Sequence, residues 1–441
     1  MNITTPRTPS GFNEYLPAEQ IEFNRLLDIV RNTYEKYGFT PLDTPVLELS
    51  EVLLAKGGGE TEKQVYRFER GRNDLTMRYD LTVPLARYVA KHEGVLAFPF
   101  RRYQIGKVYR AERAQAGRFR EFYQCDIDVI GSNSPIVDAE FPAIINDIFD
   151  QFGFGEFTIR INNRLVLNGF FEGIGLEDVS VEVLRAIDKM EKITHEELVA
   201  EFESIRLSKK QIDQVIEFTE IAGTNDEILG KLAGLGVKSE VFSDGVTKLG
   251  ALVAALRAMG VPEKRFQIDL RIARGLDYYT GTVYETVLND LPGVGSVCSG
   301  GRYDDLAGYY TKTRLTGVGI SIGLSRLFYK LCEAGVIKTT RQSLANIIVL
   351  PLDSEQVSYA LEVASELRTT GLPVILYTET ASIKKKMKYA DRMGCRYAVV
   401  IGEDEAIKRV LNVKDMTTGE SSIVSVGELA RLLKRQLVSS Q

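Results

Sequence analysis

The chain has 441 residues, of which 44% are hydrophobic and 26% are charged, and its formal net charge is -5. At roughly 100 to 200 residues per domain, a chain of this length is predicted to form two to four domains. The mildly acidic net charge excludes a protein whose whole surface is basic, but it allows a local basic patch that binds nucleic acid. No stretch approaches the roughly 18 consecutive apolar residues of a membrane span, and the N-terminal segment has no apolar run of signal-peptide type, so we expect a cytoplasmic protein without a membrane partner.

A helix is predicted near the start of the chain, because apolar residues recur at helical spacing from Phe23 to Tyr34 and Gly38 stands where a glycine commonly ends a helix. An extended segment, "FTPLDTPVLE", follows, and residues from about 50 to 160 are rich in strand patterns. From about 165 to 262 the chain becomes helical and charged, which predicts an inserted helical module.

Two strands joined by a charged loop are predicted in "YQIGKVYRAERAQAGRFREFYQCDIDVIG". On the second strand Gln124, Asp126 and Asp128 share one face, opposite an apolar face. This pattern is typical of a half-exposed sheet, but the density of arginines in the loop also suits phosphate binding. Those arginines, which bracket Glu112 and Glu121, are Arg110, Arg113, Arg118 and Arg120.

A further strand is predicted from Phe266 to Ile272, where apolar and polar residues alternate, and Arg274 continues its apolar face. An arginine on the apolar face of a strand either pairs with a buried acid, for which Asp277 is available, or lines a cavity. A buried guanidinium without a partner would cost too much free energy of desolvation. Both alternatives remain open on these residues alone. The small-residue segment "CSGGRYD", Cys298–Asp304, predicts a bend between strands.

A strand-to-helix switch is predicted in "RLTGVGISIGLSRLFYKLC", with Arg326 in the first turns of the helix. Helix starts offer backbone donors and a favourable dipole to anions, so Arg326 there can complete a phosphate site. The glycines Gly317, Gly319 and Gly323 do not match the dinucleotide-binding fingerprint, and the chain has no GxxxxGK[ST] loop.

The last hundred residues predict a separate α/β domain, because the short apolar runs "NIIVLPL", "LPVILYT" and "YAVVIG" alternate with helical segments. One of these helices, "SIKKKMKYADRMG", carries a run of lysines that is either a solvated face or a surface for RNA phosphates. We expect no zinc site and no disulfide framework, because the chain contains no CxxC pair and its cysteines lie far apart, at Cys125, Cys298, Cys332 and Cys395.

These fragments together resemble the motifs of a known family. In order, "GFTPLDTPVLE", "VYRAERAQAGRFREFYQCD" and "GVGISIGLSRL" are similar to motifs 1, 2 and 3 of class II aminoacyl-tRNA synthetases. The segments "ARGLDYYTGTVYE" and "CSGGRYDDL" resemble the two histidine signatures of histidyl-tRNA synthetases. With "MRYDLTVPLARY" and "YADRMGCRYAVVIGEDE", the resemblance covers nearly the whole chain.

The resemblance implies an α+β fold: an antiparallel sheet flanked by helices in a catalytic domain over residues 1–335, a helical insertion at about 165–262 within it, and an α/β anticodon-binding domain over 345–441. It also implies a homodimer formed through motif 1. The implied reaction joins histidine to ATP as histidyl-adenylate with release of pyrophosphate, and then transfers histidine to the 3′ end of tRNA(His). ATP is then a substrate, Mg²⁺ is expected with it, and no resident metal site is implied.

The resemblance also assigns expected roles to residues that match the motifs. The expected ATP-binding residues are Arg110, Glu112, Arg118 and Arg326, and the expected catalytic arginines are Arg110, Arg274 and Arg326. The expected histidine-binding residues are Asp80, Thr82, Gln124, Asp128, Arg274, Tyr278 and Tyr279. Within this set Asp128 and Tyr279 are expected to read the imidazole, and many bacterial members of the family have glutamate where Asp128 stands.

Two other functions are compatible with a chain of this kind. The first is the synthetase-like regulatory subunit of ATP phosphoribosyltransferase, which typically lacks the anticodon-binding domain and the catalytic arginines. The second is a class II synthetase for another amino acid, such as proline or threonine. Amino-acid-dependent exchange between ATP and pyrophosphate, measured with all twenty amino acids, separates these possibilities.

Overall fold

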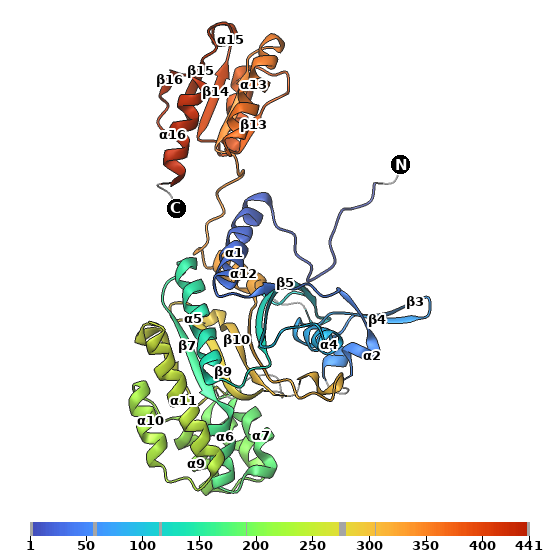
Figure 1. Ribbon diagram of the computed structural model, residues 1–441, viewed down its shortest axis with the longest axis vertical. Helices are drawn as coiled ribbons and strands as arrows, with labels where there is room; N and C mark the ends of the chain where they lie inside the picture. The colour runs from blue at the N-terminus through green and yellow to red at the C-terminus, as the bar shows by residue number, and fades with distance from the viewer. Residues whose placement is uncertain are drawn as a thin grey trace. The chain divides into compact units, whose positions relative to one another are not determined.

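A computed structural model describes residues 3–55, 60–113, 117–190, 192–272, 279–304 and 306–438 (Figure 1). The chain folds into two compact units, each built around its own β-sheet. The first contains the described residues up to 13 and from 26 to 337, and the second contains residues 14–25 and those from 338 onward. Along the described chain, no helix combines the length and apolar character that crossing a membrane requires.

The first unit is organised by a large, mostly antiparallel sheet, as the α+β prediction requires. Among its described strands, only the two outermost pairs, β1 with β5 and β7 with β8, are parallel. In spatial order the strands are β1 (Thr40–Pro41), β5 (Phe100–Tyr109), β6 (Glu121–Ile130), β11 (Gly317–Ile322), β10 (Ser296–Tyr303), β9 (Tyr279–Leu288), β7 (Phe157–Asn163) and β8 (Phe266–Ile268).

Helices cover the apolar face of this sheet. On β6 that face consists of Cys125, Ile127 and Val129, all fully buried, and burial of such side chains is the main force that holds helices against a sheet. Helix α5 (Pro135–Phe152) packs against β7, β10 and β11, and Figure 1 shows it running beside β7. Helix α12 (Leu324–Glu333) packs against β6, and helix α1 (Pro17–Lys36) is fixed where the Tyr34 hydroxyl donates to the Cys125 carbonyl at 2.9 Å. The opposite, polar face of the strands is therefore left for a cavity.

Two local predictions are wrong in the centre of the sheet. The "CSGGRYD" segment is not a bend, because Cys298 to Tyr303 belong to strand β10. Its glycines serve close approach rather than a turn: a Cβ on Gly300 would lie 2.1 Å from the carbonyl oxygen of Gly319 on β11. The strand predicted to extend to Ile272 ends at Ile268, although Leu270 and Ile272 are buried as predicted.

A second, smaller sheet lies beside the large one and leads into the helix that begins at the cavity. Its strands are β2 (Leu47–Leu49), β4 (Asn73–Met77) and β3 (Arg67–Arg70), and short helices α2 (Ser50–Leu53) and α3 (Glu60–Gln64) connect them. Helix α4 (Thr82–His92) follows β4 after a short connection. The first residues of α4 are thereby placed beside the polar face of β6.

The stretch predicted to be helical is helical in the described residues. It contains α6 (Arg164–Gly173), α7 (Ser180–Ile187), α8 (His195–Ser204), α9 (Lys209–Thr219), α10 (Asn225–Gly234) and α11 (Glu240–Ala258). Helices α6 and α11 cross closely at two glycines, since a Cβ on Gly169 would lie 2.2 Å from the Phe242 nitrogen and one on Gly245 would lie 2.6 Å from the Val166 nitrogen. Larger residues at either position would force these helices apart.

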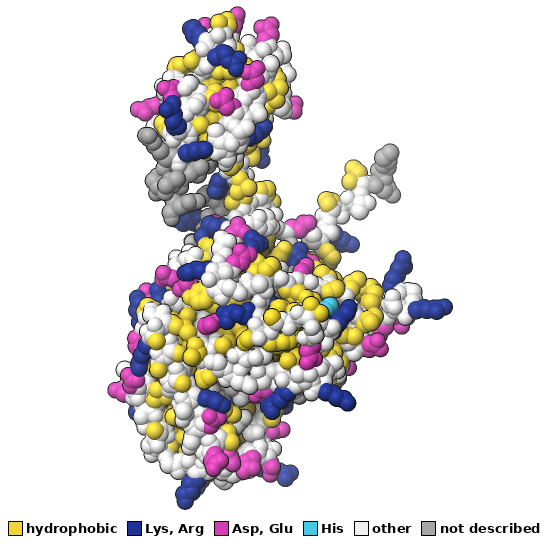
Figure 2. Space-filling view, viewed as in Figure 1, with side chains coloured by type: hydrophobic (Ala, Val, Ile, Leu, Met, Phe, Trp, Pro, Cys, Tyr) yellow, Lys and Arg dark blue, Asp and Glu magenta, His cyan; other side chains and the backbone are white. Residues whose placement is uncertain are grey.

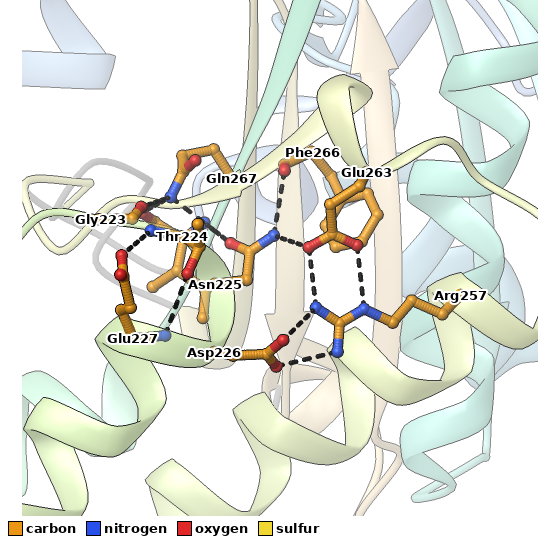
Figure 3. A network of polar contacts seen from close by, with 10 residues as sticks. Gly223, Thr224, Asn225, Asp226, Glu227, Arg257, Glu263, Phe266 and Gln267 are labelled. Carbon is orange, nitrogen blue, oxygen red and sulfur yellow. Dashed lines mark hydrogen bonds and ion pairs between the residues drawn. The ribbon is translucent and has the colours of Figure 1, made fainter.

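The start of α10 is attached to the free edge of the large sheet (Figure 3). The Asn225 side chain accepts from the Ile268 amide at 2.8 Å and donates to the Phe266 carbonyl at 3.2 Å, so it occupies the place of a neighbouring strand beside β8. Asn225 also donates to Glu263 at 3.0 Å, and Arg257 on α11 bridges Glu263 and Asp226. A single buried amide thus satisfies backbone groups that an edge strand otherwise exposes.

The second unit has a sheet in the order β13 (Val374–Leu376), β12 (Ile347–Pro351), β14 (Tyr397–Ile401), β15 (Leu411–Asp415) and β16 (Ser421–Val424). The three apolar runs noted in the sequence form its parallel part, and β15 and β16 add antiparallel strands. Helices α13 (Val357–Thr369) and α16 (Val426–Val438) contribute to the core on one side, and α14 (Ile383–Arg392) contributes to a smaller core with Ile348 and Leu350. The predicted α/β character of this segment is confirmed. A short helix, α15 (Glu403–Lys408), completes the unit.

The lysine run on α14 does not form one continuous surface. Lys384, Lys385 and Lys388 are exposed, but Lys386 is buried and its Nζ donates to the Pro351 carbonyl at 2.5 Å and to the Leu352 carbonyl at 3.2 Å. Lys386 therefore holds α14 against the end of β12 and is not available to RNA. Figure 2 shows basic and acidic side chains interspersed over the viewed face of each unit, so this face is not uniformly basic.

Candidate active site

The polar face of the large sheet forms the floor of a cavity of about 500 Å³. Strands β6, β9, β10 and β11 contribute to its lining, together with the segment before α4, the loop between β5 and β6, and the start of α12. The predicted site residues that line it are Asp80, Thr82, Arg110, Glu112, Arg118, Gln124, Asp128, Tyr279 and Arg326. Arg274 and Tyr278 lie outside the described residues, as does the neighbouring Asp277.

The strand register explains why these distant residues meet. Asp126 on β6 lies opposite Ser321 on β11, Ser321 lies opposite Ser299 on β10, and Ser299 lies opposite Glu285 on β9. Asp128 is in the next row, opposite Gly319, and a Cβ on that glycine would lie 2.1 Å from the Asp128 Oδ1. Glycine at position 319 therefore leaves room above the floor for the Asp128 carboxylate.

Asp128 is already engaged by two side chains of the protein. Its Oδ2 lies 2.7 Å from Nη2 of Arg102, which is fully buried, and its Oδ1 accepts from the Tyr303 hydroxyl at 2.7 Å. Burial raises the pKa of Asp128 above its ordinary value, while Arg102 and Tyr303 act in the opposite direction. Each carboxylate oxygen has two acceptor sites and each makes one of these contacts, so every oxygen of Asp128 retains a site for a donor from the cavity. Sequence reasoning missed Arg102, which lies directly opposite Asp128 on the neighbouring strand β5, and Tyr303, which lies far from Asp128 in the chain.

Asp80 caps the helix that begins beside the cavity. Its Oδ1 accepts from the backbone amides of Thr82 at 3.2 Å and Val83 at 3.0 Å, which are among the donors that a helix start leaves unpaired. Burial raises the pKa of Asp80, and these amides and the charge of Arg110 oppose that effect. The cap holds the Asp80 carboxylate and the Thr82 hydroxyl at one corner of the cavity.

Arg110 lies over two aromatic rings at the end of β5. Its guanidinium carbon lies 4.3 Å from the centre of the Tyr79 ring and 5.1 Å from that of Phe122, and its Nε donates to the Tyr79 carbonyl at 3.3 Å. Such stacking orients a guanidinium while leaving its outer N–H groups free to meet phosphate oxygens. The loop arginines are not equivalent, because Arg120 instead donates to the backbone carbonyls of Glu112 and Ser10.

Arg326 reaches the cavity from the first turn of α12. Its Nη2 donates to the Val294 carbonyl at 2.9 Å, at the connection between β9 and β10. This contact ties the guanidinium to the connection between these two strands. Arg110, Arg118 and Arg326 therefore give the cavity a cationic wall. Asp126 and Asp128 give it an acidic floor, and Asp80 adds a carboxylate at one corner.

Asp126 is a further buried carboxyl that lines the cavity, and it was not among the predicted site residues. Burial raises its pKa to about 7, helped by Asp128 and opposed by Arg102 and by a hydrogen bond from Ser321. Asp126 alternates along the strand with the same spacing as Gln124 and Asp128, and this shared polar face could have identified it from the sequence. Among the described residues, no group of three or more His, Cys, Asp or Glu side chains is arranged to hold a metal ion.

Comparisons with known proteins place relatives along nearly the whole chain. The model of the family described as histidyl-tRNA synthetase matches residues 11–327, and the model described as anticodon binding domain matches residues 346–436. Histidine–tRNA ligase of Clostridium tetani (strain Massachusetts / E88) is 52% identical over 436 residues, covering 98% of this chain and 99% of that protein. The enzyme of the same name from Stenotrophomonas maltophilia (strain K279a) is 45% identical over 461 residues, covering 99% of each chain.

Solved structures show the same relationship. The crystal structure of histidyl-tRNA synthetase from Nostoc sp. PCC 7120 matches with a TM-score of 0.92 and 42% identity, covering 98% of this chain and 100% of that one. A Bacillus halodurans structure titled as an ATP phosphoribosyltransferase regulatory subunit/histidyl-tRNA synthetase matches with a TM-score of 0.74 and 22% identity, covering 88% of this chain and 97% of that one, a likeness of fold alone. Relatives 52% and 45% identical in sequence cover nearly the whole chain, and the family model matches residues 11–327. The chain therefore belongs to the histidyl-tRNA synthetase family of aminoacyl-tRNA synthetases.

Proposed function

We propose that this chain activates histidine with ATP and transfers it to the 3′ end of tRNA(His). The observation that carries the proposal is a cavity in which a cationic wall faces an acidic floor. A substrate pair of ATP and an amino acid requires this combination, because phosphates need cationic donors and an α-ammonium group needs buried acceptors.

In the first step, a carboxylate oxygen of histidine forms a bond to the α-phosphorus of ATP, and pyrophosphate leaves. Arg110 and Arg326 bind ATP phosphates and stabilise the charge that develops at phosphorus, with Arg274 beside the reacting carboxylate. Glu112 and Arg118 contact the rest of ATP. The protein supplies little covalent chemistry, so it acts by orienting the two substrates and by charge stabilisation. In the second step, a ribose hydroxyl of the tRNA terminus attacks the histidyl carbonyl and AMP leaves.

The amino acid lies with its ammonium group toward Asp80, Thr82 and Gln124 and its imidazole toward Asp128, Tyr278 and Tyr279. A carboxylate accepts from one ring N–H, and a phenol donates to the other ring nitrogen, which selects the neutral imidazole. Support for Asp128 in this role comes from the acceptor capacity that remains after Arg102 and Tyr303 are satisfied.

Mg²⁺ enters with ATP as part of the substrate. Phosphate oxygens and water supply most of its preferred octahedral ligands, with one or two carboxylates of the protein. This fits a cavity whose described residues include carboxylates but no preformed cluster of metal ligands. When bound, the ion neutralises charge on the departing pyrophosphate.

Beyond the cavity, we assign residues 1–335 to the catalytic domain, with the helical insertion at about 165–262, and residues 345–441 to the anticodon-binding domain. Two copies of the chain associate through motif 1, and the enzyme works in the cytoplasm. A separate family model, described as anticodon binding domain, matches the C-terminal segment, which supports assigning anticodon binding to that segment.

The test is exchange of labelled pyrophosphate into ATP, measured with each of the twenty amino acids, followed by charging of tRNA(His). We expect exchange with histidine alone. A regulatory protein would show exchange with none of them, and the alternative of another class II synthetase predicts exchange with a different amino acid. The cationic wall and the presence of the C-terminal unit both favour the enzyme over the regulatory subunit.

A further inference from the structure

Strands β9 and β10 depart from regular pairing beside the residues proposed to read the imidazole. Gly301 on β10 lies opposite Val283 on β9, but Tyr303 lies opposite Tyr279, so one residue of β10 faces three residues of β9. Bulges of this kind redirect side chains and are common next to active sites. This bulge places Tyr303 and Tyr279, which both line the cavity, directly opposite each other and therefore on the same face of the sheet.

The single residue of β10 inside the bulge is Arg302, and each of the three facing residues of β9 lies against it or its partner. The Thr280 hydroxyl lies 3.5 Å from the Arg302 carbonyl, and a Cβ on Gly281 would lie 3.0 Å from the Arg302 Cδ. The Thr282 hydroxyl donates to Asp138 at 2.7 Å, and Asp138 forms an ion pair with Arg302. The Arg302 side chain therefore occupies the space that the bulge creates.

The guanidinium of Arg302 lies behind the sheet, because successive side chains of a strand alternate and Tyr303 faces the cavity. Its Nε donates to the Asp138 Oδ1 at 3.0 Å, in the first turn of α5. Its Nη1 donates to the Ser132 carbonyl at 2.7 Å, and its Nη2 lies 3.5 Å from the Ser134 carbonyl. Both serines follow the end of β6, so one guanidinium joins β10, α5 and the end of β6.

The strands that meet at this guanidinium carry the three side chains assembled around the imidazole site: Asp128 on β6, Tyr279 on β9 and Tyr303 on β10. We propose that Arg302 is a positioning residue for histidine recognition, which holds the bulge of β9 and the end of β6 from behind the sheet so that both tyrosines face Asp128. This inference rests on the proposed function and deepens it. Arg302 itself is not among the described residues that line the cavity.

The physical reason is that a bulge disrupts the ladder of hydrogen bonds and needs surrounding contacts to fix it. Without the guanidinium we expect β9 and β10 to shift toward regular pairing, in which Tyr303 would lie opposite Gly281. The Tyr303 hydroxyl, which donates to Asp128 at 2.7 Å, would then move away from that carboxylate. Arg110 and Arg326 lie on other elements and should keep their places, so the defect should concern histidine and not ATP.

The main test uses the double variant Arg302→Met/Asp138→Asn in the full-length protein. It removes both charges of the buried pair, so neither is left uncompensated, and it keeps an acceptor for the Thr282 hydroxyl. Thermal unfolding checks that the variant is folded, and histidine-dependent pyrophosphate exchange gives kcat and both KM values. We expect the KM for histidine to rise roughly 10-fold, the effect of one misplaced hydrogen bond, with kcat and the KM for ATP nearly unchanged.

A histidine analogue provides a readout that a loss of stability alone does not move. Histidine methylated on one ring nitrogen has no N–H on its neutral imidazole, so it cannot donate to Asp128. Its inhibition constant, measured against histidine in the exchange reaction, should be nearly the same in the wild type and the double variant. The preference for histidine over this analogue should therefore fall roughly 10-fold.

Arg265→Met is the matched control. The Arg265 side chain is about as buried as that of Arg302, with exposed fractions of 11% and 12%, and it pairs with Asp150 on the same helix and with Glu156. Arg265 precedes the outermost strand β8 and is not among the described residues that line the cavity. We expect a lower melting temperature in Arg265→Met and a wild-type KM for histidine.

Two results would overturn the inference. One is a wild-type KM for histidine in the folded double variant, which would make Arg302 purely structural. The other is a general loosening of the site, seen as an equal rise in the KM for ATP or in the inhibition constant of the analogue, or as the same rise in Arg265→Met.

A second variant keeps the inference testable if the double variant does not fold. Arg302→Lys retains the positive charge but lacks the planar fork that reaches Asp138 and the Ser132 carbonyl together. It should raise the KM for histidine in the same direction by a smaller factor, and a wild-type KM would contradict the proposed role. If the wild type itself shows no histidine-dependent exchange, the proposed function fails instead, and the two failures are thereby distinguished.

Discussion

Single residues of the cavity floor carry both stability and specificity. Asp128 illustrates this overlap, because the carboxylate expected to read the imidazole is also the partner of Arg102, an arginine with no solvent exposure. Among the residues that the structure describes, Nε and Nη1 of Arg102 have no hydrogen-bond partner, so its charge depends on few contacts. Removing Asp128 therefore does more than remove a substrate contact.

The first prediction separates the two roles of Asp128. Asp128→Ala should destabilise the protein by about 3 to 5 kcal/mol, since it leaves the Arg102 charge buried and uncompensated. The double variant Asp128→Ala/Arg102→Met should recover much of that stability, because an apolar side chain replaces the stranded charge. Urea unfolding measures the stability, and pyrophosphate exchange measures histidine activation.

Histidine activation should remain impaired in the stabilised double variant, with the KM for ATP little changed. Normal activation in that variant would show that the imidazole is read elsewhere. A double variant as unstable as Asp128→Ala would show that the Arg102 charge is compensated by groups other than Asp128.

At the scale of elements, the helical insertion is joined to the catalytic sheet through Asn225 and β8. This connection is short, and β8 immediately precedes the segment that contains Arg274. The side chain of Asn225 forms strand-like hydrogen bonds at the sheet edge, whereas Arg257, Asp226 and Glu263 form an exposed ion-pair cluster around it. Buried and exposed contacts of one junction can therefore be compared directly.

The second prediction concerns the buried part of this junction. Asn225→Ala should cost about 1 to 3 kcal/mol, because it leaves the Ile268 amide and the Phe266 carbonyl without partners. Hydrogen exchange of the Ile268 amide should accelerate in this variant. The matched control is Asp226→Asn at the neighbouring position, where loss of an exposed ion pair should cost no more than about 1 kcal/mol. Equal effects of the two substitutions would contradict the strand-like role of Asn225.

The third prediction concerns pH and the exposed part of the junction. The pKa of Glu263 is lowered, mainly by its hydrogen bonds from Arg257. A carboxyl whose pKa is lower in the folded state adds stability above its unfolded pKa and loses that contribution as pH falls through the folded value. Wild type should therefore be more stable than Glu263→Gln at pH 7, and the difference should shrink below pH ~4. A difference that is constant with pH would exclude this linkage.

At the scale of the whole molecule, the chain forms two units with separate cores, to which we assign different tasks. The residues proposed for adenylation belong to the first unit, and the exposed lysines of α14 belong to the second. Substitutions in one unit should therefore change one half-reaction and spare the other.

The fourth prediction tests that division. Replacing Lys384, Lys385 and Lys388 by alanine should raise the KM for tRNA(His) and weaken its dependence on salt, because contacts between lysine and phosphate release counterions. Pyrophosphate exchange, which needs no tRNA, should stay at the wild-type level. Lys408→Ala, an exposed lysine on α15 of the same unit, is the control. An unchanged KM in the triple variant would make the α14 lysines a solvated face.

The amino-acid sequence by itself determined the class of fold, the helical character of the stretch from about 165 to 262 and the existence of the α/β segment, because hydrophobic periodicity and turn residues are local properties of the chain. Its ordered motifs also led to the family and to a set of residues that share one cavity. Where it failed locally, as at "CSGGRYD", the reason was tertiary: glycine there accommodates a neighbouring strand and does not mark a turn.

Only the tertiary structure decided which polar residues work together. Arg102 on β5 and Tyr303 on β10 meet at the Asp128 carboxylate on β6, and the sequence pattern alone does not fix the strand register and order that bring them there. Likewise, Lys386 has the same sequence context as its exposed neighbours and differs only because its position on α14 faces the end of β12. Strand register and helix orientation are set by packing against the rest of the chain, so the partner of a buried charge becomes known only once the fold has brought the strands side by side.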